Sequence, residues 1–149
     1  MAGARRRLRC PANRYSLQGA VIAMEVPTVV ISREAGTLRV QVRGVASPEA
    51  TRAYWRQIVE EFAREPADYV LLIDELRGPA LSAEDWQALV RTLVGSGLES
   101  VRIAHVKPNG LDEVEHCELS ARQVGFQARV FMDVREARLW LRYGQQPAD

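Results

Sequence analysis

The chain has 149 residues, of which 47% are hydrophobic and 26% charged, and its formal net charge is +1 at pH 7. This length and composition are typical of a single folded domain, which buries about two thirds of the surface of its unfolded chain. The near-neutral charge excludes an overall field that would draw the protein to nucleic acid or to an acidic membrane.

The first segment, residues 1–26, contains an arginine cluster but no regular pattern, and we expect a disordered leader that precedes the folded domain. Met24 directly precedes the first patterned stretch and is an alternative start. The apolar run after the arginines is short and interrupted by polar residues, which makes a poor signal peptide. No run reaches the roughly 20 apolar residues of a membrane span, and the cysteines are only two, so we expect a reduced, cytoplasmic protein.

The first regular pattern is a pair of β-rich runs, residues 28–33 and 38–43, joined by a short link that contains Gly36. Such a link between β-branched runs predicts a hairpin. In the second run Leu38, Val40 and Val42 alternate with polar residues, so one face of this strand is expected to be buried and the other to face water.

A helix is predicted next, because Ser47 is a good N-cap and Pro48 fits the first helical position. Tyr54 beside Trp55 widens the apolar arc of this helix, and an exposed aromatic patch there would suit a protein partner or a homodimer. The apolar run at residues 69–73 then predicts a central strand that is covered on both faces.

The strand–helix unit recurs three more times. Ser82 caps a helix with Asp85 three residues later, and the run at 100–106 predicts another strand. Residues 112–124 predict a third, less clearly amphipathic helix. The last strand ends at Asp133, which caps a final helix whose apolar residues recur at helical spacing.

The predicted order is therefore ββαβαβαβα. Strands that alternate with helices imply parallel crossovers, so the sequence predicts an α/β fold with a mostly parallel five-stranded sheet and an antiparallel edge hairpin. We expect this single domain to span residues 27–144 and a short tail to follow at 145–149. Trp55, Trp86 and Trp140 each fall on an apolar helical stripe and are expected to pack in the core.

The closing stretch "RVFMDVREARLWL" resembles the end of the STAS fold, and within it the SpoIIAA-like group, in which a strand, an acidic turn and a helix with an A-x-x-W-L pattern follow each other. The resemblance covers residues 29–143, nearly all of the patterned chain. The residues that carry it are Val130, Phe131, Asp133, Ala137, Trp140 and Leu141.

The resemblance implies bacterial regulation through protein contacts, because anti-sigma-factor antagonists of this fold bind a kinase partner and are switched by phosphorylation. Their phosphoacceptor lies in an Asp-Ser-Ser/Thr-Gly motif. Asp74 matches the acid of this motif here, but Glu75 and Leu76 stand where the hydroxyl residues belong, so the switch motif is absent. Ser82 is the nearest hydroxyl, and its capping role already explains it. Other proteins of the group resemble lipid carriers, which implies an apolar-ligand module as the alternative.

Asp74 and Glu75 are the main candidates for chemistry, because they stand at the carboxyl end of a central strand, where ligands bind in open α/β sheets. Paired acids could hold a metal or act as general acid and base. A solvated turn, or one paired with Arg77, is the simpler interpretation. We therefore expect no catalytic residue and place a ligand or partner region at Asp74, Glu75, Arg77, Ser82 and Tyr54.

A zinc site at His105, His116 and Cys117 is disfavoured, because adjacent helical residues point about 100° apart and the chain has no CxxC or HxxxH pair. His105 is expected to be a hydrogen-bonded core histidine. The sequence also contains no P-loop, GxGxxG or Ser-His-Asp elbow. The first hypothesis is thus a non-enzymatic module that binds a protein partner and uses no cofactor. A ligand-binding module and an enzyme follow as alternatives.

Overall fold

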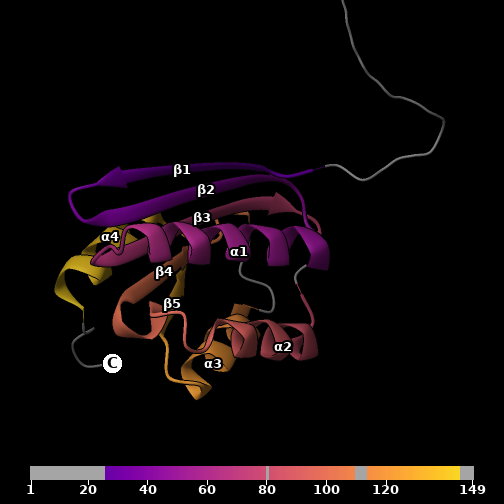
Figure 1. Cartoon of the computed structure of the whole chain (residues 1–149). Helices are drawn as coiled ribbons and strands as arrows, with labels where there is room; N and C mark the ends of the chain where they lie inside the picture. Colours follow the sequence, from indigo (N-terminus) through magenta and orange to yellow (C-terminus); the bar gives the residue numbers. More distant parts are fainter. Residues whose placement is uncertain (1–25, 80, 110–113, 145–149) are drawn as a thin grey trace, which may run out of the picture.

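The computed structural model of the chain describes residues 26–79, 81–109 and 114–144. These residues form a five-stranded sheet of strand order β1-β2-β3-β4-β5 and four α-helices (Figure 1). The expected leader and tail fall outside the described residues, apart from Val26. The strands are β1 Thr28–Glu34, β2 Thr37–Val45, β3 Tyr69–Arg77, β4 Arg102–Val106 and β5 Gln127–Phe131.

The four helices follow the predicted positions. They are α1 Pro48–Arg64, α2 Ala83–Leu93, α3 Val114–Gln123 and α4 Val134–Tyr143, and a short 3-10 helix, η4 Leu98–Ser100, precedes β4. No pattern in the sequence predicted η4. β3 extends four residues beyond its predicted end at Ile73, because the acids that follow look like a turn in the sequence although the strand continues through them.

β1 and β2 form the predicted hairpin, and all other neighbouring strands are parallel. Ala35 and Gly36 make the two-residue turn and both have positive φ, the backbone conformation that short hairpin turns require. The carbonyl of Gly36 accepts a hydrogen bond from the backbone N–H of Asp68 at 2.8 Å, so the turn contacts the residue just before β3.

The three crossover helices lie on one face of the sheet and α4 lies on the other (Figure 1). Each crossover connects a strand to its next neighbour in the same direction, and right-handed crossovers then place every helix on the same side. α4 follows the last strand and connects to no further strand, so it is free to cover the opposite face. The expected mostly parallel α/β fold with an antiparallel edge hairpin is confirmed.

The core has two parts, one on each face of the sheet. The larger part contains Leu38, Val40 and Val42 of β2, all fully buried as the alternation predicts, together with the apolar stripes of α1 and α2. The smaller part lies under α4. β3 contributes to both, with Val70 and Leu72 on one side and Leu71 and Ile73 on the other, as predicted for a central strand.

The capping predictions are also confirmed. The hydroxyls of Ser47 and Ser82 accept hydrogen bonds from the backbone N–H groups of Ala50 and Asp85, at 3.0 and 3.1 Å. Asp133 caps α4 by accepting from the N–H of Arg135 at 2.8 Å. All three tryptophans are buried.

Candidate functional site

The chemically versatile side chains meet in a buried network around Asp74. Asp74 lies within β3 and is only 4% exposed. Its Oδ2 accepts a hydrogen bond from the Tyr54 hydroxyl at 3.1 Å and lies 2.9 Å from His105 Nε2, while its Oδ1 accepts from the backbone N–H of Leu76 at 3.1 Å. The ammonium of Lys107 is 3.7 Å from the same Oδ2. Asp74 is therefore the centre of the network.

The strand register explains why these residues meet. β3 and β4 are parallel with Leu72 opposite His105, so Asp74 lies one step further along the same face as His105. Tyr54 comes from α1, which covers that face. The network thus joins the two central strands to the first crossover helix.

Glu75 points away from this network. Neighbouring residues of a strand face opposite sides of the sheet, so Asp74 lies on the α1 side and Glu75 on the other. The Glu75 carboxylate accepts from Arg43 Nε at 2.7 Å and from Gln41 Nε2 at 3.1 Å. The bonds from Arg43, followed by the one from Gln41, lower the pKa of Glu75. The hypothesis of a paired acid centre at Asp74 and Glu75 is therefore wrong.

Two further expectations need correction. Tyr54 is completely buried and Trp55 is 5% exposed, so they form no exposed aromatic patch, because α1 lies flat against the sheet with this arc turned inward. Asp74 is not in a turn paired with Arg77, because β3 runs through Arg77 itself. Arg77 is exposed and its carbonyl accepts from the backbone N–H of Ala46. Ser82 is also exposed.

The network continues to a thiol. Cys117 Sγ of α3 lies 3.4 Å from His105 Nδ1, and Cys117 is 7% exposed. Cys117, His105 and Asp74 therefore form a row in which each side chain is hydrogen-bonded to the next. The prediction of a hydrogen-bonded core histidine at His105 is confirmed. Within the described ranges, no group of three or more His, Cys, Asp or Glu side chains is arranged to hold a metal ion. The side chain of His116 lies outside the described part.

The protonation states follow from the surroundings. Burial lowers the pKa of His105 and outweighs the hydrogen bond to Asp74, so the ring is neutral at pH 7. For Asp74, burial favours the neutral form, but the hydrogen bond from His105, the charge of Lys107 and the hydrogen bond from the Leu76 N–H lower its pKa to about 2. Burial raises the pKa of the Cys117 thiol to about 12.

These states define one consistent hydrogen-bond pattern. Neutral His105 donates from Nε2 to the Asp74 carboxylate, and its Nδ1 accepts from the protonated Cys117 thiol. Burial first, and then the Asp74 charge, raise the pKa of Tyr54, whose hydroxyl therefore remains a donor. The row resembles a nucleophile–base–acid arrangement, but its thiol is protonated and inert at neutral pH.

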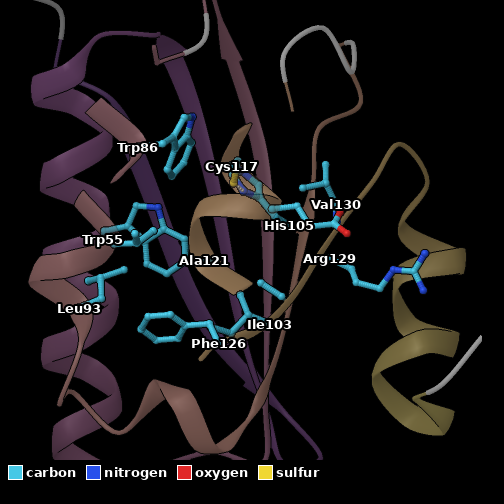
Figure 2. A pocket seen from close by; sticks show the side chains of 13 residues that line it. Trp55, Trp86, Leu93, Ile103, His105, Cys117, Ala121, Phe126, Arg129 and Val130 are labelled. Atoms are coloured by element: carbon cyan, nitrogen blue, oxygen red, sulfur yellow. Dashed lines mark hydrogen bonds between the residues drawn. The ribbon is translucent and has the colours of Figure 1, made fainter. Parts of the chain in front are cut away.

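A small apolar cavity adjoins the Cys117 end of this row, between α2, α3 and the sheet (Figure 2). Trp55 and Trp86 face it from α1 and α2, and Phe126 closes it from below in this view. The His105 ring meets both indoles edge to face, at centroid distances of 6.5 and 6.0 Å. The volume of the cavity is about 30 Å³, which corresponds to about two water molecules.

The indole N–H of Trp55 is the one buried side-chain polar atom without a hydrogen-bond partner in the described part of the chain. The wall of the cavity, which Trp55 lines, is almost entirely apolar and therefore offers few polar groups that could orient a ligand.

Asp74 and Tyr54 were predicted as site residues from the sequence, but their contacts with His105 and Lys107 were not. The sequence does contain an indication of the contact between Asp74 and His105. Each of these residues is the polar residue at a buried position of an apolar strand, "YVLLIDEL" and "VRIAHV". A buried acid requires hydrogen-bond donors, and a neighbouring strand can supply one.

The fold defined by this sheet and these helices is SpoIIAA-like, of the STAS class, as the closing motif predicted. The chain is similar to the solved structure of an uncharacterised protein from the DUF3478 family with a SpoIIAA-like fold, from Shewanella loihica PV-4. The TM-score is 0.51 at 20% sequence identity, over 83% of this chain and 99% of that chain. At this identity the likeness concerns the fold alone.

No protein-family model matches the chain, and no curated protein matches it. Among the described residues, none of the helices has both the length and the apolar character that crossing a bilayer requires.

Proposed function

We propose that the chain is a non-enzymatic SpoIIAA-like module that acts in bacterial regulation, in the cytoplasm, through contacts with a protein partner. The supporting observation is the division of polar groups at the carboxyl end of β3. Asp74 is buried and bonded to His105 and Tyr54, whereas Arg77 and Ser82 stand at the surface.

The buried groups are poor candidates for catalysis. A cysteine nucleophile reacts as its thiolate, and a thiol with a pKa of about 12 is almost entirely protonated at pH 7. His105 would have to accept that proton while it is itself buried and its pKa is lowered. The Tyr54, Asp74 and His105 contacts are better explained as a polar network that fixes the packing of α1 on the sheet.

The proposed partner region consists of groups near the end of β3 that reach the surface, namely the half-buried Glu75 and the exposed Arg77 and Ser82. Glu75 is held by Arg43, so the region presents fixed charges of both signs. Since Glu75 and Leu76 replace the hydroxyl residues of the phosphoacceptor motif, we propose that binding here is not switched by phosphorylation at those two positions.

The test is affinity capture from the bacterium that encodes the chain, with quantitative mass spectrometry of the retained proteins. The wild type is compared with Arg77→Glu and with Arg56→Glu, which reverses an exposed charge on α1. We expect a partner to be retained by the wild type and by Arg56→Glu and to be lost from Arg77→Glu. Identical profiles for all three proteins would contradict the proposed region.

A second candidate function is the binding of a small apolar ligand, which the cavity beside Cys117 favours. At about 30 Å³ it is far below the roughly 300–1,000 Å³ of ordinary ligand sites, so only a molecule of a few heavy atoms fits without movement of the walls. Native mass spectrometry of the purified protein tests this candidate. A bound mass that disappears from an Ala121→Leu variant, in which the cavity is filled, supports it. An unliganded mass for the wild type contradicts it.

A further inference from the structure

α4 carries apolar side chains on two faces. Ala137, Trp140 and Leu141 are buried against the sheet. Leu139 and Tyr143, one turn apart on the outer side, are 58% and 69% exposed. A surface helix of a monomeric domain needs only one apolar face, so the outer residues make this side of α4 a candidate contact surface.

A groove runs between the outer side of α4 and β5, the last strand of the sheet. Met132, which is 53% exposed, and Leu139 contribute its apolar walls. The volume of this groove is about 640 Å³. The groove is therefore large enough to receive side chains from another molecule, which the interior cavity is not.

The groove contains charges of both signs. Arg129 extends from β5 toward α4, away from the interior cavity (Figure 2), and its guanidinium lies 5.9 Å from the centre of the Phe131 ring. Asp133 and Glu136 line the same groove. In a two-fold symmetric contact each patch meets itself, so a groove with both signs can pair its cation with the acid of an identical groove.

The outer edge of β5 is not free to pair with a further strand at the centre of β5, because a backbone N–H there already has a partner. The carbonyl of Phe131 accepts from the Lys107 N–H on the β4 side, and alternate residues of a strand direct their backbone groups to opposite sides. The N–H of Val130 therefore points outward, where it donates to Glu118 Oε1 of α3 at 3.2 Å. A carboxylate at this place blocks pairing with a further strand.

From these observations we infer that two copies of this chain associate through the groove between β5 and α4. Met132 and Leu139 of each copy pack against those of the other, and Arg129 of each pairs with Glu136 of the second copy. The contact is made by side chains, and the Glu118–Val130 bond stays in place. This inference needs no other protein and is independent of the proposed partner region.

The first test is analytical ultracentrifugation of the full chain over a concentration series that reaches about 1 mM, the range in which even weak association is measured. We expect the wild type to form a dimer, Leu139→Asp to be monomeric, and Val94→Asp to dimerise like the wild type. Val94 is a matched control because it is 52% exposed at the end of α2. A wild type that stays monomeric, or a Leu139→Asp variant that dimerises unchanged, would overturn the inference.

The second test is a charge exchange. Arg129→Glu and Glu136→Arg each place like charges opposite one another in the symmetric contact, so each variant alone should dissociate at least about tenfold more readily. Mixing the two variants restores opposite charges at both contacts, and we expect a heterodimer of wild-type affinity. Circular dichroism verifies that each variant is folded. Unchanged dimers of the single variants, or no recovery on mixing, would overturn the pairing.

Discussion

Nε2 of His105 lies 2.9 Å from Oδ2 of Asp74, and both side chains are almost completely buried. The contact joins neighbouring parallel strands at a point where most of the surrounding residues are apolar. It explains why a carboxylate is tolerated at this depth, because a buried charge is stable only when its oxygens have donors. Asp74 has them in Tyr54, His105 and the Leu76 N–H.

Asp74→Ala is therefore expected to lower the free energy of unfolding by about 3 kcal/mol, because it leaves several buried donors without an acceptor. Glu75→Ala is the matched control. It removes the neighbouring carboxylate, whose bonds to Arg43 and Gln41 lie on the other face, and should cost at most about 1 kcal/mol. Urea denaturation of both variants measures the difference. Equal losses would contradict the distinct roles of the two acids.

The same network predicts a dependence of stability on pH. Because the pKa of folded His105 is lowered from 6.5, the unfolded chain binds more protons as the pH falls below that value, and the folded state loses stability. Asp74 adds a second loss. Its folded pKa of about 2 is below the ordinary 3.8, so its contribution is complete above about pH 4 and disappears between pH 4 and 2.

Urea denaturation between pH 7.5 and 5 tests the histidine part in a His116→Gln background, where His105 is the only histidine. We expect the free energy of unfolding to fall by up to about 1.4 kcal/mol per pH unit below pH 6.5. The further change His105→Gln should flatten this slope. Parallel pH curves for the two proteins would show that His105 is not the titrating group.

Much of the fold could be predicted from the sequence because its signals are local. Ser47, Ser82 and Asp133 cap the helices that they were expected to begin, since a cap depends on residues within one turn. The alternation of Leu38, Val40 and Val42 showed the buried face of β2 for the same reason. The extent of β3 was not predictable in this way, because "DELR" reads as a turn unless its neighbours in the sheet are known.

The site depended on contacts between distant parts of the chain. Tyr54 is 20 residues from Asp74, and His105 is 31 residues away, so only the register of β3 and β4 and the position of α1 bring them together. The interpretation of Tyr54 as partly exposed failed because helical spacing shows which residues share a face but not how much of that face the sheet covers. His105 was expected to be hydrogen-bonded in the core, but its partners Asp74 and Cys117 could not be named from the sequence.

Cys117 should be unreactive in the folded protein. Its thiol is buried and has a pKa of about 12, so little thiolate exists at pH 8 and reagents cannot approach it. In a Cys10→Ser background, a chromogenic disulfide reagent should label less than about a tenth of the protein in buffer and one thiol per chain in concentrated urea. Rapid, complete labelling without urea would mean that the row from Asp74 to Cys117 opens readily to solvent.

Variants of Ser82 test whether the hydroxyl that follows β3 along the chain has a structural role. Its hydroxyl accepts from the Asp85 N–H at 3.1 Å, and loss of such a cap costs about 1 kcal/mol. Ser82→Ala should therefore lower the free energy of unfolding by about that amount, whereas Ser82→Asp should stay near the wild type, because aspartate also caps helices and its charge is favourable at a helix N-terminus. Thermal and urea unfolding measure both variants. If the aspartate variant is as unstable as the alanine variant, capping does not explain the serine at this position. The role of its hydroxyl would then lie in contacts with a partner.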